Sequence, residues 1–88
     1  MKRNHYIYMD HGASTPVDPQ VVEAMLPYFT AQYANPSSSH HHGRLAKQGL
    51  ATARRAIADL LYCRPDELVF TGCGSESDNL ALRGAMFA

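Results

Sequence analysis

The sequence predicts an α/β fold in which short strands alternate with amphipathic helices. A β-favouring run at 67–71 is followed by a glycine-bearing turn and by a helical pattern from Glu76 onward. Apolar residues recur at helical spacing over 19–33, and again from about residue 42 to residue 62. A second short β-favouring run at 6–9 precedes both helices. Together these observations indicate strand, helix, helix, strand and helix in that order.

Cap and breaker residues set the expected ends of the two earlier helices. Asp18 is a typical N-cap, and Pro19 suits the first helical position. We expect Pro27 to bend the first helix, because its ring displaces a backbone hydrogen bond. The long helix is expected to end near Tyr62, since Pro65 cannot continue it.

The chain is expected to be a single incomplete segment. The predicted last helix reaches Ala88 with no glycine cap, proline or polar tail after it. We divide the chain into three parts: an N-terminal arm and first helix (1–34), a loop and long helix (35–62), and a strand–turn–helix (63–88).

Composition argues against several classes of partner and location. Eight basic and eight acidic residues cancel, so charge gives no reason to expect nucleic acid or an anionic membrane as a partner. No apolar stretch approaches the roughly 18 residues of a membrane span, and no signal-peptide run follows the charged N-terminus. We therefore expect a soluble cytoplasmic protein.

The two cysteines have a functional and a structural interpretation. Arg64 lies beside Cys63, and Cys73 lies at the start of a predicted helix, two settings that favour a thiolate. Their spacing matches no common metal site, and two cysteines are too few for a disulfide scaffold. The favoured interpretation is that both are small side chains that fill space.

The turn before the last helix is a candidate anion site. The first amides of a helix lack internal partners, and the helix dipole favours negative charge there. Gly72 and Gly74 would allow close approach of the backbone, and the hydroxyl of Ser75 could donate a hydrogen bond. A plain capping box from Ser75 to Asp78 is the competing interpretation, and local chemistry alone favours it because Glu76 and Asp78 add negative charge.

Three segments resemble motifs of NifS/IscS-type (group I) cysteine desulfurases, in the class V aminotransferase family. They are MDHGASTPVD at 9–18, NPSSSHHHG at 35–43 and FTGCGSESDN at 70–79. The family patterns are LDNNATTPVD, NPSSxHxxG and either FTSGGTESDN or FTSGATESDN, in the same order and spacing. The second pattern argues against the other desulfurase group. Ser75 stands for the usual threonine, Cys73 for a small glycine, and His11 and Gly12 for two asparagines.

The resemblance implies the N-terminal part of a fold-type I transferase that depends on pyridoxal 5'-phosphate (PLP). Its reaction would convert L-cysteine to L-alanine and pass sulfur to an enzyme persulfide, for iron–sulfur cluster or thiolation pathways. Gly74, through its backbone, and Ser75, through its amide and hydroxyl, would contact the cofactor phosphate. The family is homodimeric and can serve sulfur-acceptor proteins.

The resemblance also implies that the chain contains no catalytic residue. The family's PLP lysine and catalytic cysteine lie far downstream of the matched motifs, and the two lysines present, Lys2 and Lys47, match neither position. We therefore expect the 88-residue chain to be inactive alone.

Two other hypotheses remain. The chain could be a non-enzymatic truncated remnant, or a binding partner of a full-length homologue. Alternatively, His40, His41 and His42 with His5 and His11 could form a small metal module. Adjacent loop histidines seldom converge on one ion, and His40 matches the motif histidine, so we assign no metal ligand.

Overall fold

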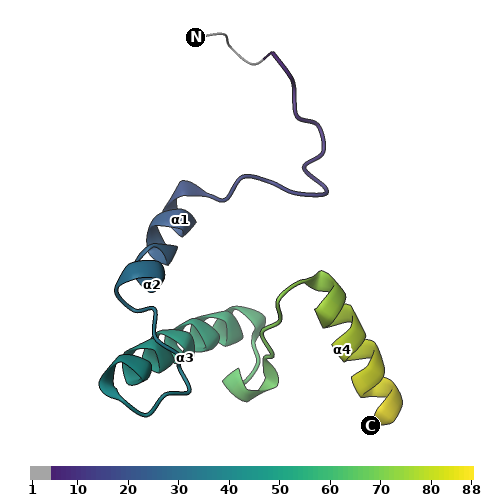
Figure 1. Ribbon diagram of the computed structural model, residues 1–88. Helices are drawn as coiled ribbons and strands as arrows, with labels where there is room; N and C mark the ends of the chain where they lie inside the picture. Colours follow the sequence, from purple (N-terminus) through teal and green to yellow (C-terminus); the bar gives the residue numbers. More distant parts are fainter. Residues whose placement is uncertain (1–4) are drawn as a thin grey trace. The chain divides into compact units, whose positions relative to one another are not determined.

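The computed structural model describes residues 5–88, which form helices joined by loops (Figure 1). The chain divides into two compact units on either side of the Ala46–Lys47 bond, which lies inside the longest helix. The elements are α1 (Pro19–Met25), α2 (Pro27–Thr30), α3 (His41–Leu61), the 3₁₀-helix η1 (Pro65–Glu67) and α4 (Gly74–Phe87).

Neither predicted strand forms within residues 5–88. The run at 6–9 has no ladder partner, and neither does the run at 68–71, while Glu67 belongs to η1. A β-strand is completed by hydrogen bonds to a neighbouring strand, and the Leu68 carbonyl instead accepts a hydrogen bond from Arg54. The described part of the chain is therefore helical, and the α/β prediction is not confirmed.

Pro27 divides the first predicted helix in two. Asp18 caps α1 as expected, accepting a hydrogen bond from the Gln20 amide at 2.8 Å, and Pro19 is its first residue. Pro27 has no N–H to donate, so α1 ends before it and α2 begins at it. The prediction of one helix over 19–33 was wrong, because α2 ends at Thr30.

The motif at 35–43 forms a tight junction between a loop and the start of α3. The side chain of Asn35 accepts a hydrogen bond from the Ser37 amide at 2.9 Å, and its carbonyl accepts one from Ser38 at 3.0 Å. His40 Nδ1 accepts from the Gly43 amide at 3.1 Å, which caps the first turn of α3. A Cβ atom at Gly43 would lie 2.3 Å from the Ser38 carbonyl oxygen, so only glycine fits there.

A Schellman motif ends α3. The Cys63 amide donates to the Ala58 carbonyl at 3.0 Å, and the Tyr62 amide donates to Asp59 at 3.4 Å. Tyr62 has a φ of 56°, a left-handed conformation that glycine usually supplies at this position. The helix ends at Leu61, within one residue of the expected position.

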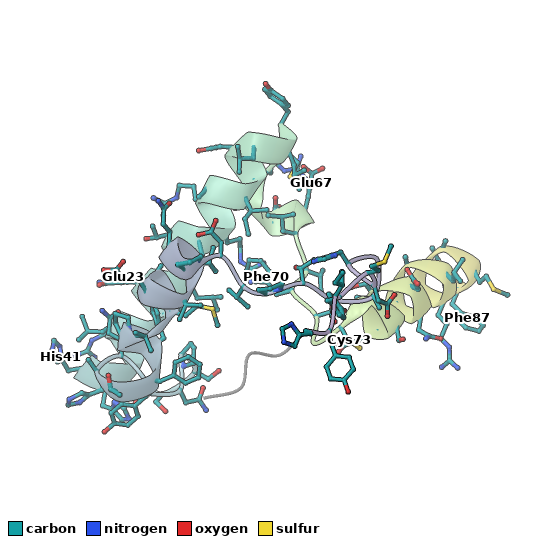
Figure 2. All side chains as sticks on the ribbon, turned by 90° about the horizontal axis from the view of Figure 1, so that it is seen from above. Glu23, His41, Glu67, Phe70, Cys73 and Phe87 are labelled. Carbon is teal, nitrogen blue, oxygen red and sulfur yellow. The ribbon has the colours of Figure 1, made fainter. Side chains whose placement is uncertain are left out.

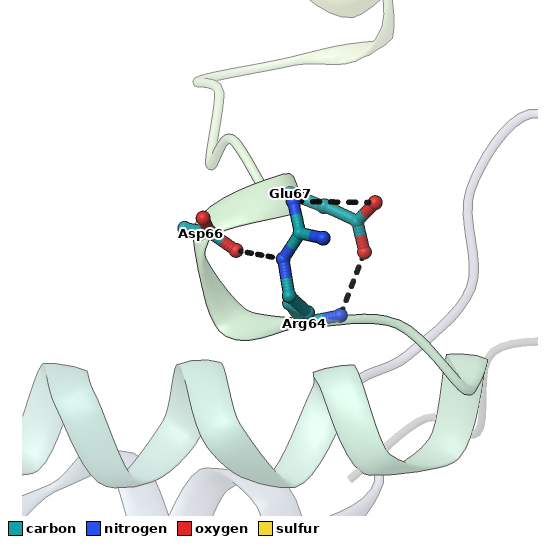
Figure 3. Close-up of polar contacts among 3 residues, drawn as sticks. All are labelled: Arg64, Asp66 and Glu67. Carbon is teal, nitrogen blue, oxygen red and sulfur yellow. Dashed lines mark hydrogen bonds and ion pairs between the residues drawn. The ribbon is translucent and has the colours of Figure 1, made fainter.

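Arg64 is engaged by the two carboxylates of η1 (Figure 3). Its amide donates to Glu67 Oε2 at 2.7 Å, its Nε atom lies 3.0 Å from Asp66 Oδ1, and its Nη2 atom lies 3.9 Å from Glu67 Oε1. These exposed pairs add little stability. They show that the guanidinium group beside Cys63 in the sequence is paired with Asp66 and Glu67.

Few side chains are buried in the described part of the chain. Among residues 5–88 the buried positions are Gly43, Ala46 and Ala58. Large apolar side chains such as Leu60, 78% exposed, and Leu61, 61% exposed, remain accessible along the helices. Apolar burial therefore contributes little to the stability of either unit. No helix among residues 5–88 combines the length and apolar character needed to cross a membrane.

Candidate functional site

The candidate anion site lies at the beginning of α4. Cys73 is the N-cap, with extended φ and ψ of −166° and 171°, and its side chain makes no capping hydrogen bond. The first helical bond runs from the Ser77 amide to the Cys73 carbonyl at 3.1 Å. The amides of Gly74, Ser75 and Glu76 therefore have no intrahelical acceptor. Figure 2 shows Cys73 at this end of α4 and Phe87 at the other.

The predicted capping box from Ser75 to Asp78 does not form, because α4 begins at Gly74 and Ser75 is already its second residue. Instead, Glu76 contacts the turn before the helix, where its Oε2 atom accepts from the Gly72 amide at 3.0 Å. This places Glu76 three residues after the N-cap, from where a carboxylate can reach back over the turn.

Hydroxyl groups hold the same turn closed. The Thr71 hydroxyl donates to the Cys73 carbonyl at 3.2 Å and also pairs with the Ser77 hydroxyl. From the second turn of α4, the Asn79 side-chain amide donates to the Ser75 carbonyl at 2.8 Å. These contacts fix the backbone and leave the Ser75 hydroxyl without a partner among the described residues.

The donor set and the open space fit a phosphate group. Among residues 5–88, a Cβ atom built at Gly74 would meet nothing within 4 Å, so the described chain leaves open space beside the first amides. A phosphate there would accept hydrogen bonds from backbone N–H groups and from one hydroxyl, and such donors are typical of helix N-termini that bind anions. The Glu76 carboxylate is turned toward Gly72, where it already accepts a hydrogen bond.

Arg54 is a residue of this region that sequence reasoning missed. It is one of four basic residues of the long helix, with Arg44, Lys47 and Arg55. In the structure, its Nη1 atom donates to the Leu68 carbonyl at 2.7 Å. Its guanidinium carbon also lies 4.6 Å from the centre of the Phe70 ring. No sequence pattern distinguishes Arg54 from its neighbours, because both contacts are tertiary.

The first motif forms a separate feature in the unit that precedes Lys47. The Tyr8 hydroxyl hydrogen-bonds the Asp10 carbonyl at 3.0 Å and the Ser14 carbonyl at 2.9 Å, and its ring meets the His11 ring edge-on. An open hollow of about 430 Å³ lies here, lined by Tyr8, His11, Ser14, Thr15 and Pro16. His11 thus contributes an aromatic wall where the family pattern has an amide side chain.

The histidine cluster gains no support as a metal centre. The rings of His40, His41 and His42 contact one another edge-on, and His40 Nδ1 is used by the Gly43 amide. Within 5–88, no group of three or more His, Cys, Asp or Glu side chains is arranged to hold a metal ion. Cys63 and Cys73 are both free thiols.

Comparison with known proteins gives consistent relatives. Residues 7–87 match the aminotransferase class-V family. The chain is 50% identical over 82 residues to the cysteine desulfurase of Trichormus azollae, covering 93% of this chain and 20% of that protein. It is 47% identical over 85 residues to the cysteine desulfurase IscS of Methanosarcina thermophila, covering 97% and 21%. No solved structure matches significantly.

A mitosomal cysteine desulfurase of Trachipleistophora hominis is 48% identical over 81 residues, covering 91% of this chain and 18% of that protein. The chain thus spans about one fifth of the length of the curated relatives it matches. Because the family match extends over 7–87 and includes all three motifs, the chain belongs to the aminotransferase class-V family.

Proposed function

We propose that the chain is the N-terminal portion of a PLP-dependent cysteine desulfurase and that Gly74 and Ser75 hold the cofactor phosphate. The complete enzyme would convert L-cysteine to L-alanine and transfer sulfur to an enzyme persulfide for iron–sulfur cluster or thiolation pathways. The observation that carries the proposal is the set of unpartnered amides and the free hydroxyl at the start of α4, in a chain of this family.

The role of these residues is to bind and orient. Backbone amides fixed by the helix need no reorganisation to receive a phosphate, and the helix dipole adds to the attraction. When bound, PLP supplies an electron sink for the reaction. Gly74 and Ser75 act on the phosphate alone, so the proposal assigns no proton transfer to them and no catalytic residue to the 88 residues.

The proposal includes the family's wider properties. L-cysteine is the substrate of the complete enzyme, the functional form is a homodimer, sulfur-acceptor proteins are possible partners, and the location is cytoplasmic. Lys47 lies on the exposed side of α3, and Lys2 lies outside the described residues. Neither receives a covalent role, and the 88-residue chain alone is expected to be inactive.

Pyridoxine 5'-phosphate tests the phosphate site without covalent chemistry. It carries the phosphate but has no aldehyde, so it cannot react with Lys2 or Lys47, and pyridoxine is the control without phosphate. Equilibrium dialysis of the full chain should give saturable binding of the phosphate ester and none of pyridoxine. Equal binding of both compounds would contradict the proposal.

Ser75→Ala separates phosphate binding from helix formation. The Ser75 hydroxyl makes no hydrogen bond within residues 5–88, so the helix should persist in the variant, while the phosphate loses one donor. We expect about tenfold weaker binding, the effect of losing one hydrogen bond to a charged group. Gly84→Ala is the matched control, since it also places an alanine in α4, at a position free of contacts among the described residues. Equal affinity of the two variants would refute the assignment.

The lysine assignment is tested with PLP itself. After incubation and borohydride reduction, we expect no stoichiometric label at a single lysine of the chain. A persistent label confined to Lys47 would overturn the view that the covalent anchor is not among these 88 residues.

A non-enzymatic role in binding a full-length homologue is a second candidate. The observation that favours it is the number of large apolar side chains that remain exposed on the helices, including Ile57 and Leu60 on α3. Co-expression with a full-length class-V relative would test it. A stable complex that leaves no PLP site on the short chain would favour this role, and the absence of any complex would count against it.

A further inference from the structure

Arg54 connects α3 to the segment that leads into the candidate phosphate site. Its Nη1 atom donates to the Leu68 carbonyl at 2.7 Å, and its guanidinium carbon lies 4.6 Å from the centre of the Phe70 ring. Arg54 is partly buried by these contacts. The next residue, Arg55, is exposed and has no side-chain partner within residues 5–88.

Within residues 5–88, the segment held by Arg54 makes no other long-range hydrogen bond. Leu68 is extended, with φ of −99° and ψ of 137°, but residues 68–71 have no ladder partner in the described chain. The Leu68 amide donates only to Pro65, inside η1. Directly after Phe70, Thr71 and Gly72 enter the turn that Glu76 closes. The position of this turn on α3 therefore depends on what anchors the backbone at 68–70.

We propose that Arg54 is a positioning residue for the cofactor-phosphate site. By fixing Leu68 and Phe70 against α3, it sets the position and direction of the free amides of Gly74 and Ser75. This inference rests on the proposed function, but it adds a residue on another helix that touches neither the phosphate nor the first turn of α4.

The chemistry of the two contacts explains why arginine suits this position. A guanidinium group donates hydrogen bonds in its plane and stacks on an aromatic ring through its face, so it can make both contacts at once. A lysine ammonium at the same place could reach the Leu68 carbonyl, but it could not also stack on Phe70. Glutamine could make at most a neutral hydrogen bond.

The test is a titration of the 88-residue, ¹⁵N-labelled chain with inorganic phosphate, followed at the Gly74 and Ser75 amides. Arg54→Gln, Arg54→Lys and Arg55→Gln are compared with the unmodified chain. Arg54→Gln and Arg55→Gln remove the same positive charge from adjacent positions. The difference between them therefore excludes the general loss of electrostatic attraction for phosphate. Far-UV circular dichroism of each variant reports the helix content.

We expect Arg54→Gln to weaken phosphate binding about tenfold, the effect of losing one charge-assisted hydrogen bond, and Arg55→Gln by no more than about twofold. Arg54→Lys should fall between them, at unchanged helix content. Equal affinities of the two glutamine variants would overturn the proposal. If Arg54→Gln loses helix content, Arg54→Lys decides: weakened binding supports the role, and affinity equal to that of the unmodified chain overturns it.

Failure of the proposed function has a different signature. If the unmodified chain shows no phosphate response at Gly74 and Ser75, the phosphate assignment is wrong. The positioning role is then judged from the amide shifts of Gly72 and Gly74 without phosphate. Changes in Arg54→Gln that are absent from Arg55→Gln would support positioning, and identical shifts in the two variants would overturn it.

Discussion

Replacing Gly43 by alanine should detach the 35–38 loop from the start of α3. The new Cβ atom would lie 2.3 Å from the Ser38 carbonyl oxygen, 2.8 Å from Ser38 Cβ and 2.9 Å from the Asn35 carbonyl oxygen. Two of these three neighbours are backbone atoms, which cannot move aside as the end of a flexible side chain can. The loop must therefore shift as a whole, which breaks the contacts that define the junction.

Two opposing effects determine the magnitude. Alanine is favoured over glycine inside a helix by about 1 kcal/mol, whereas forcing an extra methyl group into a closed contact costs about 1–3 kcal/mol. Because the closest separation is far below a normal contact, we expect the upper part of that range, and a net loss of about 1–2 kcal/mol for the closed junction. Gly84→Ala is the matched control, since its Cβ atom meets nothing within 4 Å.

Amide hydrogen exchange measures this effect directly. In Gly43→Ala, protection of the Ser38 and Gly43 amides should fall roughly five- to thirty-fold, since these amides donate within the junction. In Gly84→Ala these amides should be unchanged, and α4 should gain protection. The reasoning is refuted if Ser38 keeps its protection in Gly43→Ala, or if both variants behave as simple helix-stabilising changes.

Three further predictions concern caps and charge. His40→Ala should weaken the first turn of α3 by about 1 kcal/mol, because the Gly43 amide loses its acceptor. His42→Ala is the control and should leave this turn unchanged. Equal losses of amide exchange protection in the two variants would contradict the prediction. Tyr62→Gly should stabilise the end of α3 by about 1 kcal/mol by removing left-handed strain, and a lower thermal midpoint would show the opposite. Glu76→Gln keeps an acceptor for the turn but removes a negative charge beside the proposed phosphate, so phosphate should bind several-fold more tightly. Asp78→Asn should have a smaller effect of the same sign. Unchanged phosphate affinity in both variants would count against the site.

The long helix was predicted well from its periodic pattern, because many apolar residues along it lie on the same face. The helix expected from about residue 42 to 62 is α3, His41–Leu61, and Asp18 with Pro19 begins α1 as expected. The helix over 19–33 was overextended because Pro27 removes one hydrogen bond in a short segment, where few others compensate. The strands were not confirmed, since a strand depends on a partner that local sequence does not specify.

The turn that carries the candidate site was predicted in its place along the chain, but its hydrogen bonds were not. Gly74 and Ser75 do lie at the start of α4, yet the expected box between Ser75 and Asp78 is replaced by the contact of Glu76 with Gly72. The expected box spans three residues and the observed contact spans four, and several acidic and hydroxyl side chains lie within that reach, so pattern alone could not choose between them. Arg54 could not be identified, because its contacts cross 14 residues of sequence.

The most direct test of the central claim follows the α4 amides during titration with pyridoxine 5'-phosphate. If the start of this helix binds phosphate, the Gly74 and Ser75 amide resonances will shift most and will saturate together. The same resonances will not shift when pyridoxine is added instead. Shifts of equal size with both compounds, or shifts confined to residues outside 72–77, would show that the phosphate is not held there.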